Sequence, residues 1–166
     1  SLTDYMSKVE AKKINGKEYA YLVENKWFKR KIDGKSRGSR QKVSKYLGKV
    51  HCFEKANNEE FLSFKKIASL EDYLKNDKNS IIRDLVEWEV YRHNIGNIFI
   101  IDFDNKKIIK NRKEVSLRLN EGFLNSYTFS RLFNLKKEDR LYLAKCFVEA
   151  GIEIPKEVFV GLFSKA

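Results

Sequence analysis

The chain has 166 residues, of which 42% are hydrophobic and 34% are charged, and its formal net charge is +11. This length allows one domain or two small ones with a hydrophobic core, and the composition excludes intrinsic disorder. No apolar stretch approaches the roughly 18 residues of a membrane span, and the first residues contain no signal-peptide core. We therefore predict a cytoplasmic protein with no membrane partner. We expect Cys52 and Cys146 to be reduced thiols. A disulfide between them is the alternative, because abundant Lys and Glu with a single Gln are typical of thermophiles, whose intracellular proteins do contain disulfides.

The first third of the chain is predicted to form a three-stranded antiparallel β-meander. Asn-Gly and Asp-Gly pairs are the strongest short signals for tight hairpins, because both turn positions require positive φ. The expected strands cover residues 8–14, 18–32 and 40–47, with turns at Asn15-Gly16 and Asp33-Gly34 and an end at Gly48.

The rest of the chain alternates between helical and strand patterns. Asn58 and Ser69 are expected to cap two short helical pieces within residues 57–76. A longer helix is predicted from Asn79 or Ser80 to about His93, because its apolar residues recur at helical spacing. A hairpin is expected around Asp104-Asn105, formed by residues 98–103 and 106–110 and extended by 115–119; helices follow at about 125–134, 136–150 and 155–164. The predicted fold class is α+β, with a basic meander in residues 1–55 and a helical α+β domain in 56–166 that carries the hairpin near 97–110.

Positive charge is concentrated in the meander. Residues 1–55 contain 15 Lys/Arg and 6 Asp/Glu, a net charge of +9, whereas residues 56–166 contain 19 Lys/Arg and 17 Asp/Glu, a net charge of +2. Such asymmetry indicates a polyanionic partner, because Lys and Arg neutralise phosphates and release counterions. The predicted nucleic-acid contacts are Lys26, Trp27, Lys29, Arg30, Lys31, Lys35, Arg37, Arg40, Lys42 and Lys45.

Alternation of side chains along the strands gives the expected faces of the meander. Strict period two places Lys42 with Arg40 and Ser44 on one face, and Lys45 with Gln41 and Val43 on the other. Tyr19, Tyr21 and Phe28 are expected to pack in the core against the later helices, whereas Trp27 is left open between packing and stacking on bases.

The segment of residues 8–50 resembles the N-terminal module of insertion-sequence transposases of the DDE type. The similar residues are Ile14-Asn15-Gly16-Lys17-Glu18-Tyr19-Ala20-Tyr21-Leu22-Val23-Glu24, Asp33-Gly34-Lys35 and Gln41-Lys42-Val43-Ser44-Lys45-Tyr46-Leu47-Gly48-Lys49. Some archaeal Fic-type proteins carry a similar segment before their catalytic domain. In transposases the resemblance implies recognition of element DNA. Residues 56–166 continue neither family, because they have neither the carboxylate set of a DDE enzyme nor the His-Pro-Phe loop of a Fic enzyme.

The sequence leaves three further hypotheses. Asp102 and Asp104, with Glu87 or Glu89, could hold Mg²⁺ in a nuclease, although Asp is equally favoured as a turn former. The basic sheet could instead bind an acidic protein. The apolar C-terminal helix is expected to dock on the core or on a second copy, which would give a homodimer. The main prediction is a non-enzymatic nucleic-acid-binding protein of a mobile element, phage or prokaryotic regulator, with DNA favoured over RNA and with no cofactor or metal.

Overall fold

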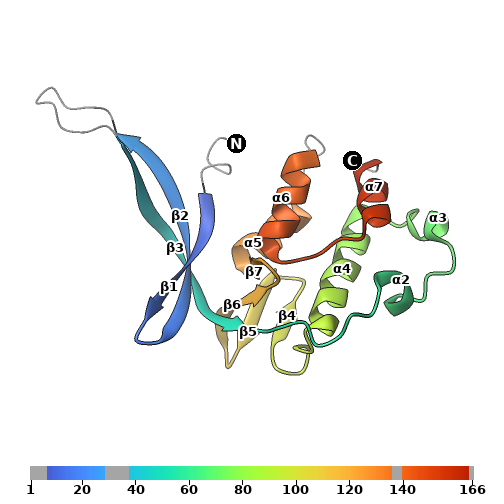
Figure 1. The fold of residues 1–166 in the computed structure, drawn as a ribbon, viewed down its shortest axis with the longest axis horizontal. Helices are drawn as coiled ribbons and strands as arrows, with labels where there is room; N and C mark the ends of the chain where they lie inside the picture. Colours follow the sequence, from blue (N-terminus) through green and yellow to red (C-terminus); the bar gives the residue numbers. More distant parts are fainter. Residues whose placement is uncertain (1–6, 29–37, 136–139, 165–166) are drawn as a thin grey trace, which may run out of the picture.

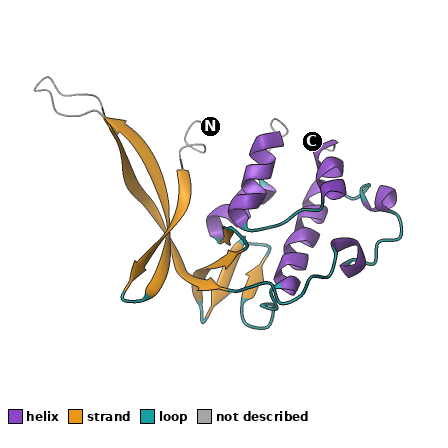
Figure 2. Ribbon diagram, in the orientation of Figure 1, coloured by secondary structure: helices purple, strands orange, loops and turns teal. Residues whose placement is uncertain are grey.

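The computed structural model describes residues 7–28, 38–135 and 140–164, and the side chains of 26–28, 38–40 and 164 lie outside that description. The fold is α+β, as predicted. A long antiparallel meander projects from one end, and its third strand continues into the part of the sheet that packs against the helices (Figures 1 and 2). No helix in the described ranges is long and apolar enough to cross a membrane.

The meander consists of β1 (Ser7–Ile14), β2 (Lys17–Phe28) and β3 (Gly38–Cys52). Asn15 and Gly16 have φ values of 51° and 79°, which confirms the predicted tight turn. The predicted end of the third strand at Gly48 is wrong, because β3 continues to Cys52. Gly48 has a φ of +97°, and a Cβ there would lie 2.5 Å from the carbonyl oxygen of Glu114. Glycine at this position therefore allows β3 to approach a later strand closely instead of ending the element.

Two register shifts between β2 and β3 change the predicted faces of the meander. They lie between Ala20 and Tyr21 and between Leu22 and Val23 of β2. As a result Lys42 is opposite Glu24 and Lys45 is opposite Leu22, so the two lysines share one face. The expected separation of Lys42 from Lys45 is therefore wrong, because each bulge places an extra β3 residue in the ladder and inverts the alternation beyond it.

The later strands extend the same sheet. They are β4 (Ile100–Asp102), β5 (Lys107–Lys110), β6 (Lys113–Leu119) and β7 (Gly122–Leu124). The strand order is β1-β2-β3-β6-β5-β4, and β7, which is outside this order, pairs with Leu117–Leu119 of β6. Lys49–Cys52 of β3 pairs in parallel with Val115–Arg118 of β6. Strand β3 therefore belongs both to the meander and to the sheet of residues 56–166, and the predicted boundary near residue 55 falls just after this shared strand.

The helices are α2 (Phe61–Phe64), α3 (Leu70–Tyr73), α4 (Lys78–Arg92), α5 (Ser126–Phe133), α6 (Arg140–Ala150) and α7 (Lys156–Ser164). Ser69 caps α3 as predicted, because its side chain accepts a hydrogen bond from the backbone N–H of Asp72. The predicted cap of α2 is wrong, since Glu60 occupies the N-cap position and makes no side-chain cap bond. The predicted start of α4 is also late. Its N-cap is Asp77, which accepts from the backbone N–H of Ser80 at 3.2 Å.

Two hydrophobic clusters stabilise these layers. The larger one is centred on α4, α5 and the β6 strand, and it also takes in Val158 and Leu162 of α7. The C-terminal helix thus docks on the core of its own chain, while Val160 remains 61% exposed. The smaller cluster contains Ala20, Leu47 and Val50 and is covered from the β7–α5 side. It anchors the base of the meander to the rest of the fold. Both cysteines are free thiols.

Candidate nucleic-acid interface

The predicted contact set divides into described and undescribed parts. Lys29, Arg30, Lys31, Lys35 and Arg37 lie outside the described residues. Lys26, Trp27 and Arg40 belong to the ladder between β2 and β3, where Lys26 is opposite Arg40, but their side chains are not described, and the same holds for Phe28. Lys42 and Lys45 are exposed, on one face of β3.

The opposite face of the meander carries three tyrosines in mutual contact. The ring of Tyr46 lies 5.3 Å from that of Tyr21 and 6.4 Å from that of Tyr19, measured between centroids. Tyr19 and Tyr21 belong to neither hydrophobic cluster, so their predicted packing against the helices is wrong. Tyr46 is 53% exposed. Partial burial, followed by the two neighbouring tyrosines, raises the pKa of Tyr46, which keeps its hydroxyl protonated at neutral pH. This face therefore combines uncharged tyrosine rings with lysines, since Lys12 lies 5.4 Å from the centroid of the Tyr21 ring and Lys49 is opposite Tyr19.

Most lysines of the described meander are free to bind an anion. Lys8 forms an ion pair with Glu10. Glu18 forms an ion pair with Arg118 of β6 and not with a lysine of the meander. Among the described residues, no ion pair involves the remaining lysines of β1–β3 whose side chains are described. These are Lys12, Lys13, Lys17, Lys42, Lys45 and Lys49. Unpaired surface cations of this kind keep their full charge available to phosphates.

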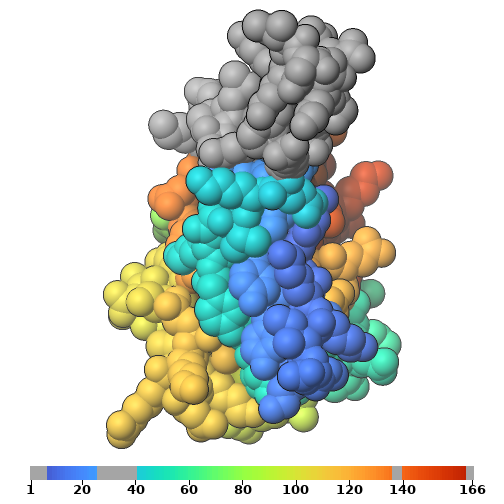
Figure 3. All heavy atoms as spheres, turned by 90° about the vertical axis from the view of Figure 1, so that its left-hand side faces the viewer, coloured from blue at the N-terminus to red at the C-terminus, as the bar shows by residue number. Residues whose placement is uncertain are grey.

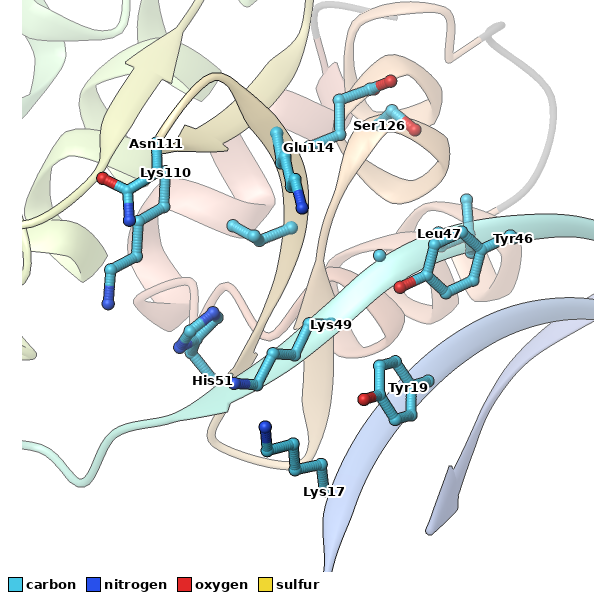
Figure 4. A pocket seen from close by; sticks show the side chains of 13 residues that line it. Lys17, Tyr19, Tyr46, Leu47, Lys49, His51, Lys110, Asn111, Glu114 and Ser126 are labelled. Atoms are coloured by element: carbon cyan, nitrogen blue, oxygen red, sulfur yellow. The ribbon is translucent and has the colours of Figure 1, made fainter. Parts of the chain in front are cut away.

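A pocket of about 700 Å³ lies where the meander meets the β5–β6 hairpin; we call it the junction pocket. In Figure 3 the meander lies in front, next to the segment that contains this hairpin. One wall carries Tyr19 and Tyr46, and Figure 4 shows these two rings side by side. The cationic residues that line it are Lys17, Lys49, Lys110 and Lys113, and the lining carboxylate is Glu114. The pocket thus combines an aromatic wall with excess positive charge.

The tip of the β5–β6 hairpin brings more cations to this pocket. Lys110 of β5 is directly opposite Lys113 of β6. Asn111 and Arg112 form the turn between them with φ values of 50° and 65°. Two like charges opposite each other destabilise a ladder, and a positive φ is unfavourable for arginine. Both costs are tolerated at one exposed tip, which is typical of a segment retained for binding.

His51 lines the junction pocket together with Lys49 and Lys110. Burial lowers its pKa first, and the charges of Lys110 and Lys49 lower it further. Its imidazole makes an edge contact with Phe99, with 5.2 Å between ring centroids. The direction of this shift agrees with the position of His51 in the same pocket as the two lysines.

Neither the hairpin tip nor the junction pocket is among the sites predicted from the sequence. A signal for the tip was present, because Asn111 is the second residue of a basic Lys-Asn-Arg-Lys run between two apolar strands, and Asn is favoured where φ is positive. The pocket had no such signal. It depends on the parallel pairing of β3 with β6, which joins segments that are far apart in the chain.

The acidic residues proposed for a metal site serve local structure. The Oδ1 of Asp102 accepts the backbone N–H groups of Asp104 and Asn105, at 3.1 and 3.0 Å. The side chain of Asn105 also donates a hydrogen bond to Asp102. This bond first, and then the backbone bonds, lower the pKa of Asp102. The turn-forming role of Asp102 is thus confirmed. Glu89 is fully buried and accepts from Arg92 at 2.7 Å. The described residues contain no group of three acidic, His or Cys side chains that could hold a metal ion.

Comparisons with known proteins add no relative. The chain matches no protein-family model, no curated protein and no solved structure.

Proposed function

We propose that this protein is a non-enzymatic nucleic-acid-binding protein whose basic meander contacts the phosphate backbone. The observation that carries the proposal is the set of unpaired meander lysines described above, which lie on both faces of the sheet. Phosphate contacts by lysine depend on charge more than on geometry, so a two-sided basic ribbon can follow a backbone without reading its sequence. The hairpin tip around Arg112 adds cations beside the base of the ribbon.

We favour DNA over RNA because residues 8–50 resemble the N-terminal module of transposases. A role in a mobile element, a phage or a prokaryotic regulatory system follows from the same resemblance. The two free thiols agree with a reducing compartment, so we place the protein in the cytoplasm. A homodimer through the C-terminal helix belongs to the same proposal, because Val160 remains exposed on α7.

The test is binding to duplex DNA across a salt series. The logarithm of the affinity should fall linearly with the logarithm of salt concentration, with a slope of about −0.9 for each phosphate neutralised. The double variant Lys42→Ala/Lys45→Ala should bind more weakly to all sequences alike and reduce the slope by about 2. A flat salt response, or no binding at low salt, would reject the proposal. If the protein then captures an acidic protein and the complex persists after nuclease treatment, the protein-interaction alternative is favoured.

A further inference from the structure

The four lysines of the junction pocket come from two parts of the chain. Lys17 and Lys49 belong to the meander, whereas Lys110 and Lys113 belong to the β5–β6 hairpin. None of the four makes an ion pair within the described part of the chain. Lining of this kind favours an anionic ligand, because an anion relieves the repulsion between the lysines.

The tyrosine wall adds a second requirement. Tyr46 offers an exposed ring, and Tyr19 lies next to it in the same wall (Figure 4). A flat aromatic ligand can stack on such rings, and bases do so whatever their identity. A free phosphate ion would use the lysines without the tyrosines. A ligand that uses both carries an anion and a planar ring on one molecule.

Polar groups and size complete the description of the ligand. Asn111, Glu114 and Ser126 also line the pocket. Their side chains can hydrogen-bond to the edge of a base or to a sugar hydroxyl, and a carboxylate is a natural acceptor for an exocyclic amine. The volume of about 700 Å³ falls within the usual range of small-ligand sites, roughly 300–1,000 Å³.

The floor of the pocket is fixed by the backbone. Leu47 and Gly48 line the pocket, and the carbonyl oxygen of Leu47 accepts a 2.7 Å hydrogen bond from the buried hydroxyl of Ser116. Gly48 has no side chain to separate the two strands. Because the strands are joined in this way, the two walls keep their spacing before any ligand arrives, and less ordering is needed on binding.

We propose that the junction pocket holds one unpaired nucleotide of the bound nucleic acid, with its phosphate among the lysines and its base against Tyr46. This inference rests on the proposed function and deepens it, because it assigns a preference for single-stranded or frayed nucleic acid. Bases inside a duplex are stacked on each other and cannot present a face to a tyrosine. An unpaired nucleotide can place its base and its phosphate in one pocket.

The test compares two probes by fluorescence anisotropy. One is a labelled mixed-sequence single strand of about twelve nucleotides, within the site sizes of known single-strand binders, and the other is its blunt-ended duplex. Tyr46→Ala should weaken single-strand binding on the order of tenfold, the loss expected for one stacked base. It should change duplex binding by less than about twofold, because duplex binding uses phosphates alone. Tyr46→Phe keeps the ring and should retain the affinity of the wild type.

The control is Lys42→Ala/Lys45→Ala, on the face opposite the tyrosines, which should weaken both probes alike. Equal weakening of both probes by Tyr46→Ala, or no weakening of the single strand, would overturn the nucleotide site and leave the proposed function intact. Wild-type protein that binds neither probe would overturn both. A competition experiment distinguishes an acidic peptide. If polyglutamate displaces the labelled single strand with the same efficiency as unlabelled single strand, the ligand is an acidic peptide and the nucleotide site is overturned.

A second readout needs no variant in the pocket. The chain has two histidines, and only His51 lines the junction pocket. The imidazole proton signals of His51 should shift when the single strand is added and stay nearly unchanged with the duplex, while those of buried His93 serve as the internal reference. Equal shifts of His51 with both probes would contradict the assignment.

Discussion

Arg112→Gly should make the protein more stable and at the same time a weaker binder. Asn111 and Arg112 are the two central residues of a tight turn and both have positive φ, at 50° and 65°. Such turns favour Asn-Gly. For a residue with a Cβ this conformation costs about 1–2 kcal/mol, and glycine gives back roughly 0.5–1 kcal/mol through the greater freedom of its unfolded chain. Arg112 is exposed and has no ion pair or ring contact within the described residues, so the folded state loses no such contact.

The net gain in the free energy of unfolding is therefore about 0.5–1 kcal/mol, which corresponds to a rise in Tm of roughly 1–4 °C for a chain of this size. Binding should change in the opposite direction, because the tip loses one cation. The affinity for DNA should fall for all sequences, and the salt slope should decrease by about 1. Thermal unfolding followed by circular dichroism measures the first effect, and anisotropy across a salt series measures the second.

Arg112→Ala is the matched control for this experiment. It removes the same charge but keeps a Cβ at positive φ, so it should weaken binding as much as Arg112→Gly without the rise in Tm. Equal Tm values for the two variants would refute the strain argument. Unchanged affinity in both would remove the hairpin tip from the interface.

Three other perturbations test separate parts of the structure. Gly48→Ala should destabilise the fold by about 3 kcal/mol or more in urea unfolding, because the added Cβ clashes with backbone at a positive φ. The control Gly96→Ala should be near neutral in the same assay, because its Cβ would meet only a methyl group at 3.6 Å. Glu89→Gln leaves the buried Arg92 without its closest anion and should cost about 3 kcal/mol in the same assay. The pKa of His51, lowered in the free protein, should rise when single-stranded DNA binds, because an anion favours the protonated imidazole. The affinity for single-stranded DNA should therefore increase as the pH falls through the interval between the pKa of the bound protein and that of the free protein. An NMR titration with and without DNA measures it, and an unchanged pKa would place the phosphate elsewhere.

Local signals account for the elements that were predicted correctly. The turn at Asn15-Gly16 follows from the positive φ that both positions require, and the Ser69 cap follows from a single side-chain bond to Asp72. Where two neighbouring residues are both suitable for the same local role, the sequence does not distinguish between them. Asp77 caps α4 three residues before Ser80, and both residue types are good caps. Gly48 was interpreted as a strand end, but it marks a close approach of two backbones.

The candidate site could be predicted only in its charge. Counting residues was sufficient to place the positive excess in the first 55 positions, because net charge is a property of composition. The faces of the meander could not be derived in this way. The bulge between Leu22 and Val23 places Lys45 with Lys42 and leaves Tyr46 on the face with Tyr21, and a bulge depends on how two strands pair.

The sequence by itself thus determined the α+β class, the basic meander and the order of its elements, because turns, caps and periodicity act between near neighbours. Only the tertiary structure decided that β3 pairs with β6, and with it the junction pocket between Lys49 and Lys110. That pairing joins segments more than sixty residues apart, Lys49–Cys52 and Val115–Arg118. It depends on Gly48, on the bond from Ser116 to Leu47 and on burial of the surrounding core. Such contacts are selected by the packing of the whole chain, and no local pattern specifies them.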